Sequence, residues 1–180
     1  GPTPTPQPGN GLVGYWTFSE GAGNVINDVS GLNHNGFNNG GIWDVGYLDF
    51  SIKFNGANSN VDLTHPYWAG IFNNNNDFTI MAWVKPNAYN MASIVGQEYG
   101  TSMVFGIGLD GRLFLNMDDT RENSPKSDEV VYTQRWQHVA VSFKQSNHMA
   151  SFYISGNPIG SGVSWDGSGT TPSNQLYIGW

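Results

Sequence analysis

Short stretches dominated by aromatic and β-branched residues recur along the chain, each bounded by Gly, Pro, Asn or Ser. The clearest are residues 15–21, 78–86 and 136–143. Such stretches are typical of β-strands, and no helical repeat of comparable strength accompanies them. The pattern therefore predicts an all-β fold built from short strands.

Turn residues separate several of these strands. Asp110-Gly111 lies between two apolar stretches and is the strongest hairpin signal, because both residue types tolerate a positive φ. Gly156-Asn157 is a weaker one. In residues 78–84 both faces are apolar or aromatic, which favours a central strand covered on both sides. Many short strands with turns between them predict a sandwich or barrel. Strands are expected at about 12–18, 50–55, 59–63, 77–85, 92–98, 103–109, 112–117, 129–133, 136–144, 149–155 and 175–179.

Composition narrows the classes of partner. The chain has 180 residues, which suits one domain with a short tail. Its formal charge is −7 with only seven basic residues, which argues against a nucleic-acid partner. Cysteine is absent, which is compatible with a secreted bacterial module, and neither a membrane-spanning stretch nor a signal peptide is visible.

The first eleven residues alternate Pro with Thr, Gln and Gly. Such a composition favours an extended spacer that buries nothing. Residues 1–11 are therefore expected to be a linker that joins this domain to other parts of an extracellular protein. Gly1-Pro2 also matches what remains after cleavage of an expression tag. The folded domain is expected over residues 12–180.

Several ordered phrases give the chain a family resemblance: residues 12–23, 28–36, 51–56, 78–86, 136–143, 152–156 and 176–179. Together they resemble the laminin-G-like, concanavalin A-like jelly roll of laminin G modules, pentraxins and bacterial lectin-like domains. The resemblance spans about residues 12 to 179 and implies an antiparallel two-sheet sandwich.

The C-terminus departs from this family pattern. Members usually continue past the phrase Leu-Tyr-Ile-Gly into a last strand with an acidic residue and alternating apolar residues, whereas this sequence stops at Trp180. The resemblance places that strand beside the first one, so without it an unpaired sheet edge and an apolar groove are expected. Either the chain is truncated, or another segment or subunit fills the gap.

The segment 28–36 is the candidate metal site. Calcium prefers six to eight hard oxygen ligands, and an Asp followed by Ser, Gly and Asn in a tight loop supplies them. The resemblance implies a structural calcium at this loop, with a carbonyl near the Phe-Asn-Gly phrase and an acidic residue in the final strand. The predicted ligands are Asp28, with Ser30, Asn33 and Gly56 as weaker candidates. The alternative is an Asx-turn in which Asp28 caps local amides.

Aromatic residues in expected loops are the candidate ligand-binding groups. Sugar rings have apolar faces that stack on aromatic planes, while Asn, Asp and Gln bind the hydroxyls. Tyr67, Trp68, Tyr99 and Trp165 are the predicted stacking residues, and Trp43, Tyr47 and Tyr89 are of the same kind. The alternative for each is packing at loop bases. Trp16, Trp83 and Trp136 lie inside strand phrases and are assigned to the core.

The sequence gives little support for a catalytic site. Glycoside hydrolysis needs two carboxylates held a fixed distance apart, but Asp118-Asp119 and Asp128-Glu129 are neighbours that point to opposite faces of a strand. The four His residues lack zinc-ligand spacing. The chain is therefore expected not to be an enzyme.

Two functions follow from these observations. The first is a non-catalytic carbohydrate-binding or adhesion module of a secreted or cell-surface bacterial protein, with a structural calcium. Its partner would be a glycan, a polysaccharide or a cell-surface protein, without nucleic-acid binding or membrane insertion. The alternative is an assembly module that contacts other proteins, or copies of itself, through the incomplete C-terminal edge.

Overall fold

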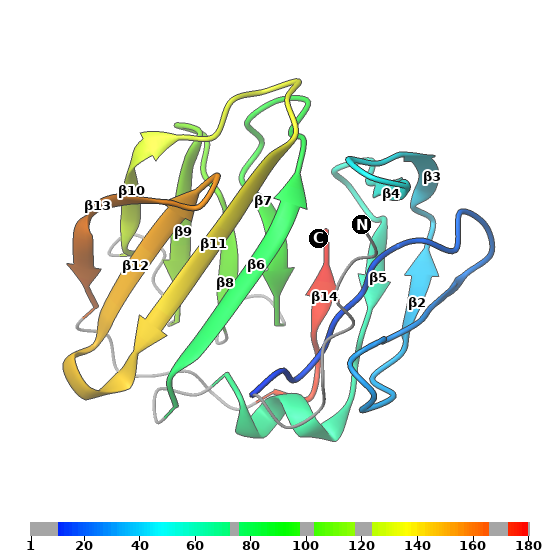
Figure 1. Ribbon diagram of the computed structural model, residues 1–180, viewed down its shortest axis with the longest axis horizontal. Helices are drawn as coiled ribbons and strands as arrows, with labels where there is room; N and C mark the ends of the chain where they lie inside the picture. Colours follow the sequence, from blue (N-terminus) through cyan, green and yellow to red (C-terminus); the bar gives the residue numbers. More distant parts are fainter. Residues whose placement is uncertain (1–10, 73–75, 98–102, 118–123, 166–172, 180) are drawn as a thin grey trace.

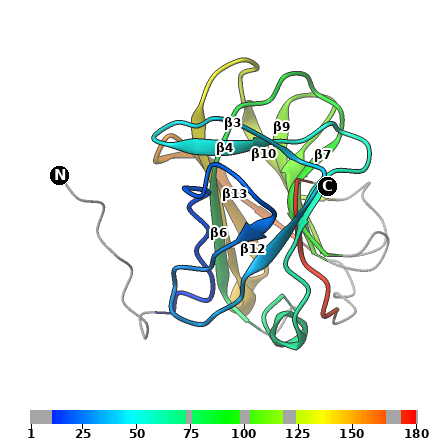
Figure 2. The same cartoon turned by 90° about the vertical axis from the view of Figure 1, so that its right-hand side faces the viewer.

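The computed structural model describes residues 11–72, 76–97, 103–117, 124–165 and 173–179. Two antiparallel sheets pack face to face (Figures 1 and 2), which confirms the predicted all-β sandwich. A small third sheet, a hairpin, crosses one end of the sandwich (Figure 2). The expected linker falls almost entirely outside the described residues. None of the helical segments in the described part of the chain has the length and hydropathy of a membrane span.

The larger sheet has eight strands in the order β1-β2-β5-β14-β7-β8-β9-β10. Their bounds are Val25–Ile26 (β1), Gly36–Asn39 (β2), Asn60–Asp62 (β5), Tyr177–Ile178 (β14), Ala92–Gly96 (β7), Val104–Ile107 (β8), Arg112–Asn116 (β9) and Lys126–Val130 (β10).

The smaller sheet has four strands in the order β13-β12-β11-β6, and the hairpin has two. Their bounds are Asn157–Ser164 (β13), Met149–Ile154 (β12), Gln137–Lys144 (β11), Phe78–Val84 (β6), Ile42–Val45 (β3) and Phe50–Lys53 (β4). Two 3-10 helices complete the described structure, Pro66–Gly70 (η1) and Gln145–Asn147 (η3).

Strand β11 organises the smaller sheet. It pairs in register with β12 on one side and with β6 on the other. Val139, Val141 and Phe143 alternate along it and are buried against the larger sheet, as the period of two requires. Phe152 lies opposite Val141 and is also buried. Apolar side chains from both sheets thus form one core between the layers.

Most predicted strands are present with small shifts of their ends. The hairpin at Asp110-Gly111 is confirmed, with Gly111 at φ +78°. The second turn is centred one residue earlier than predicted, because Ser155 and Gly156 both have positive φ. Residues 12–18 were expected to form a strand, but the described pairing there is a single bridge between Trp16 and Asp28.

Four strands have no counterpart in the sequence prediction: β1, β2, β3 and β13. Strands β2 and β13 consist largely of Gly, Asn and Ser, residue types with low strand propensity. They form because neighbouring strands supply their ladder partners: β5 for β2, and β12 for β13. Local sequence carries little trace of such long-range pairing.

The prediction of a central strand at residues 78–84 is wrong. Within the described residues, β6 has a ladder partner only on one side, β11. Its outward face is open, since Met81 is 62% and Trp83 44% exposed. The assignment of Trp83 to the core is therefore also wrong. The apolar residues on its second face cover no sheet but form an accessible surface.

Replacing Phe152 by Ala is expected to lower the free energy of unfolding by about 3–5 kcal/mol, because it opens a cavity at a fully buried site. Phe37→Ala, at a half-exposed position of β2, is the matched control and is expected to cost much less. Urea denaturation of both variants measures the difference. Equal losses would contradict the placement of the core between the sheets.

Candidate functional site

The Asp28 loop is held by the carboxylate of Asp28, which accepts four hydrogen bonds. The backbone N–H groups of Tyr15 and Ser30 donate to Oδ1, each at 2.9 Å. The Ser30 hydroxyl donates to Oδ2 at 2.7 Å, and the His34 N–H donates to the same oxygen at 3.0 Å. The side chain is buried. It therefore joins the N-terminal segment to the loop that precedes β2.

The same hydrogen bonds stabilise the ionised form of the Asp28 carboxyl group. Burial raises the pKa of Asp28, but the hydrogen bonds from Ser30, Tyr15 and His34 outweigh it, so the pKa lies below its ordinary value. The Nδ1 atom of the His34 ring lies 4.0 Å from Oδ2 of Asp28 but forms its hydrogen bond with another residue. That nitrogen is 2.9 Å from the carbonyl oxygen of Val13 and so donates a hydrogen bond to it.

This arrangement fits an Asx-type cap better than a calcium cage. The Asp28 lone pairs already receive four N–H and O–H donors, whereas calcium needs oxygens free to point at the ion. Asn33 and Gly56 are exposed and have positive φ, and Ser30 uses its hydroxyl on Asp28. Among the described residues there is no group of three or more His, Asp or Glu that could hold a metal ion.

The four predicted stacking residues do not form one site. Trp68 is 1% exposed, and its indole N–H donates to the Leu63 carbonyl. Trp165 is 3% exposed and packs against Phe143. Both side chains pack in the interior, which was the alternative interpretation, and neither presents a ring face to a ligand. The prediction that Trp68 and Trp165 stack on a ligand is therefore wrong. Tyr67 is 37% exposed beside the His34 ring and stays a candidate, while Tyr99 lies outside the described residues.

An exposed aromatic pair lies between β6 and the β3–β4 hairpin instead. Trp83 stacks on Tyr47 of the β3–β4 hairpin, with ring centroids 3.7 Å apart and an interplanar angle of 12°. The ring of His138, opposite Trp83 on β11, forms a T-shaped pair with the indole, with ring centroids 5.5 Å apart. Tyr47 is 52% exposed. We call Trp83, Tyr47 and His138 the aromatic platform.

The rest of that sheet face is mixed: Met81 is apolar and 62% exposed, Ala140 is buried, and hydroxyl groups lie further along it. In the register of the sheet, Thr79, Ser142 and Ser151 form a row four residue pairs away from Trp83 and His138. Ala140 and Tyr153 lie between the two rows, on the same side of the sheet. A flat surface that combines stacked aromatic rings with hydroxyl groups suits a sugar ring. Alternation along 79–83 could have indicated this face, but only the structure shows that Tyr47 of the hairpin lies against Trp83 while Met81 stays exposed.

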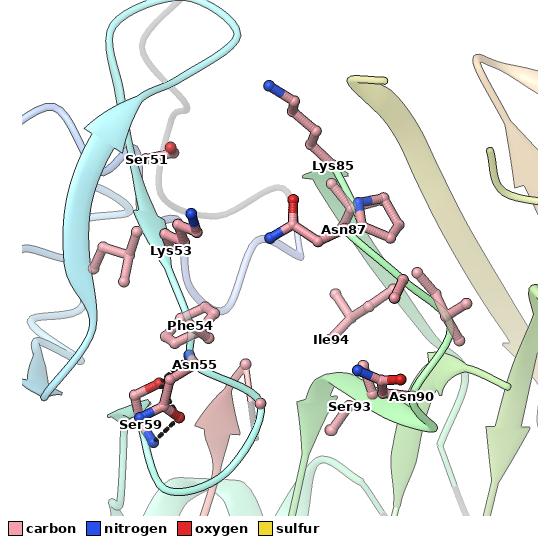
Figure 3. A pocket seen from close by; sticks show the side chains of 18 of the residues that line it. Ser51, Lys53, Phe54, Asn55, Ser59, Lys85, Asn87, Asn90, Ser93 and Ile94 are labelled. Carbon is pink, nitrogen blue, oxygen red and sulfur yellow. Dashed lines mark hydrogen bonds between the residues drawn. The ribbon is translucent and has the colours of Figure 1, made fainter. Parts of the chain in front are cut away.

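A groove adjoins the platform. Its volume is about 590 Å³, and Trp83 forms part of its wall. Strand β4 lines one side, and β6 with the loop that follows it lines the other. In Figure 3, Lys53 and Phe54 lie on the first side, and Lys85, Asn87 and Ile94 on the second.

The comparisons with known proteins agree with this architecture. The family model described as the concanavalin A-like lectin/glucanases superfamily matches residues 55–180, more than half of the chain. The chain belongs to this superfamily. The match includes β6, the platform residues Trp83 and His138, and most of the core, whereas the Asp28 loop and Tyr47 precede it. A search of curated proteins found no match.

Solved structures show the same fold at low identity. A Trypanosoma rangeli sialidase in complex with 2,3-difluorosialic acid matches with a TM-score of 0.63 and 19% identity, over 96% of this chain and 28% of that one. Domain 4 of AbnA, a GH43 extracellular arabinanase from Geobacillus stearothermophilus, in complex with arabinotriose, gives 0.52 and 18% over 78% and 75%. A structure described as a receptor binding domain gives 0.59 and 16% over 85% and 40%.

The chain covers less than a third of two of the solved structures that it matches. The chain spans 30% of the first solved structure matched, a putative carbohydrate binding protein from Bacteroides ovatus (TM-score 0.44, 23% identity, 57% of this chain), and 28% of the sialidase.

Removing the Asp28 carboxylate is expected to destabilise the fold. Asp28→Ala leaves buried donors without an acceptor, so the free energy of unfolding should fall by at least about 1–3 kcal/mol. Because its pKa is lowered in the folded state, Asp28 stabilises the fold above the ordinary pKa of 3.8, and this contribution is lost as the pH falls through the folded value. Denaturation between pH 7 and 2 should therefore show wild type and variant converging in acid.

Asp49→Ala, at an exposed hairpin position, is the control and should leave stability nearly unchanged. A constant difference between the Asp28 variant and wild type across the whole pH range would contradict the assigned role of the charge.

Proposed function

We propose that the protein is a non-catalytic carbohydrate-binding module that binds a glycan on the outward face of the smaller sheet. The observation that carries the proposal is the aromatic platform, in which Trp83 and Tyr47 are stacked and both about half exposed. An exposed aromatic face of this kind holds a sugar by its apolar face, and His138, opposite Trp83, can bind sugar hydroxyls. Membership of the superfamily supports a lectin-like role.

The first ligands to test follow from the matched structures. Domain 4 of AbnA was solved with arabinotriose, so arabino-oligosaccharides are one class. The Trypanosoma rangeli enzyme was solved with a sialic acid derivative, so sialylated glycans are another. An array that contains both classes, together with plant and microbial polysaccharides, tests the proposal directly. An absence of binding at millimolar glycan would overturn it.

We also propose that the protein has no catalytic activity. Asp128 and Glu129 are exposed neighbours on β10, in the larger sheet and away from the platform, and the pair Asp118-Asp119 lies outside the described residues. Glycoside hydrolysis would require two converging carboxylates beside the bound sugar. We also infer that the module works outside the cell, where glycans of these classes occur, as part of a longer protein.

Trp83→Ala is expected to weaken glycan binding about tenfold or more, which corresponds to about 1.4 kcal/mol of lost stacking. Phe37→Ala removes an exposed aromatic ring from the other sheet and should not change affinity. Isothermal titration calorimetry with the best array ligand gives the comparison. If Tyr67→Ala abolished binding while Trp83→Ala did not, the ligand would sit at η1, as the sequence indicated.

The sequence predicts calcium at the Asp28 loop, whereas the hydrogen bonds of Asp28 favour a loop that is held without an ion. Since the Asp28 carboxylate is occupied by four donors, we expect that calcium at about 5 mM, above the dissociation constants of extracellular sites, leaves the melting temperature unchanged. Scanning calorimetry with calcium and with EDTA tests this. A calcium-dependent rise that disappears in Asp28→Asn would restore the metal site.

A further inference from the structure

The outward face of the smaller sheet carries a second aromatic ring, Tyr153 of β12. Along this strand Ala150, Phe152 and Ile154 are buried in the core, so Tyr153 and Ser151 point to the opposite side. Strands β6, β11 and β12 lie side by side (Figure 1). Tyr153 therefore shares one sheet face with Trp83 and His138 of the aromatic platform.

The register of the sheet fixes how far apart the two aromatic residues lie. Met81, Ala140 and Tyr153 form one row across the three strands, and Trp83 lies two residues further along β6. Two strand spacings across and two residues along place the Cα atoms of Trp83 and Tyr153 about 12 Å apart on a diagonal. One pyranose ring is shorter than this distance. A ligand that contacts both aromatic rings must therefore be a chain of sugars.

The surface between the two rings has room for such a chain. The diagonal from Trp83 to Tyr153 crosses β11 between His138 and Ala140. The methyl group of Ala140 is buried and does not rise above the sheet, while the exposed Met81 beside it has a flexible side chain that adapts to a ligand. On the other side of the diagonal, the His138 ring is placed to bind sugar hydroxyls.

The middle of this face contains no Asp, Glu, Lys or Arg. Its outward residues on the three strands are Thr79, Met81, Trp83, His138, Ala140, Ser142, Ser151 and Tyr153. Charged residues lie at its borders: Lys85 follows the end of β6, and Lys144 forms an ion pair with Asp77. A sugar acid that lies across the middle would lose solvation without gaining a cation. The face therefore favours a neutral glycan.

We propose that this face binds the interior of a neutral, extended polysaccharide chain that crosses the strands diagonally. One sugar of the chain contacts Trp83 and Tyr47, and a later sugar of the same chain stacks on Tyr153. This inference rests on the proposed glycan-binding function and specifies its ligand class.

The position of these residues favours the interior of a chain over its end. Recognition of a terminal sugar requires a concave pocket that encloses it. The groove beside the platform has Trp83 in its wall, but His138, Ala140 and Tyr153 are not part of its lining. These three residues belong to the sheet surface, across which a chain can continue in both directions.

The test is isothermal titration calorimetry of the full chain with linear oligosaccharides of two and of five sugars. The probes are α-1,5-arabino-, β-1,4-xylo- and β-1,4-gluco-oligosaccharides, with sialyllactose as the charged, short probe. For the series that binds, the five-sugar ligand should bind about tenfold more tightly than the two-sugar ligand, because it reaches a second aromatic ring. Sialyllactose should bind more weakly than the five-sugar ligand.

Variants of the second ring locate the chain. Tyr153→Ala should lower the affinity for the five-sugar ligand about tenfold and leave that for the two-sugar ligand unchanged, which removes the dependence on length. Tyr153→Leu keeps much of the apolar volume without the ring and should have the same effect. Phe37→Ala, on the larger sheet, is the control and should change neither affinity. Far-ultraviolet circular dichroism establishes that each variant is folded.

The outcomes separate this inference from the proposed function. Binding that requires Trp83 but is equally tight for two and five sugars, or is unaffected in both folded Tyr153 variants, would overturn the extended chain and leave the platform as a site for one sugar. Tighter binding of sialyllactose than of every neutral five-sugar ligand would overturn the neutral class. If no glycan binds at all, the proposed function itself fails, and this inference fails with it.

Discussion

The apolar contact between the two sheets is the interaction on which the rest of this structure depends. Val139, Val141 and Phe143 of β11 and Phe152 of β12 supply the inner face of the smaller sheet. The larger sheet supplies Phe105, Leu113 and Leu115. Burying these side chains fixes the register of β11 against both neighbours, because a slip by one residue would turn them to solvent.

That register also determines what the outward face carries. With Ile80 buried and Ala82 and Val84 packed on the core, Met81 and Trp83 must point away from it. The pairing of Trp83 with His138 follows from the same alignment. The aromatic platform thus follows from the packing of the core, and Tyr47 completes it from the hairpin, whose Trp43 and Ile52 also pack against that core. A binding face built on a sheet in this way is rigid, which suits recognition of a sugar ring.

The sequence predicted the fold class and most core strands because their signals are local, but it did not predict β1, β2, β3 and β13, whose pairing is long-range. Alternation in residues 137–143 and the turn at Asp110-Gly111 depend on neighbours along the chain, and both were predicted. The site was less accessible to prediction because exposure depends on sheet order. Nothing in residues 78–84 tells an edge strand from a central one, so Trp83 was assigned to the core. The error at Trp68 was the opposite one. Pro66 and Gly70 indicated an exposed loop there, but the indole is buried beside Trp16.

The stack of Tyr47 on Trp83 ties the hairpin to the smaller sheet. Trp83 lines the groove, and Tyr47 belongs to the hairpin whose strand β4 lines the opposite wall, so this contact links the two walls. Anything that changes the spacing of the walls must shift the geometry presented to a sugar. By thermodynamic linkage, a sugar that binds this stack would in turn hold the two walls at one spacing.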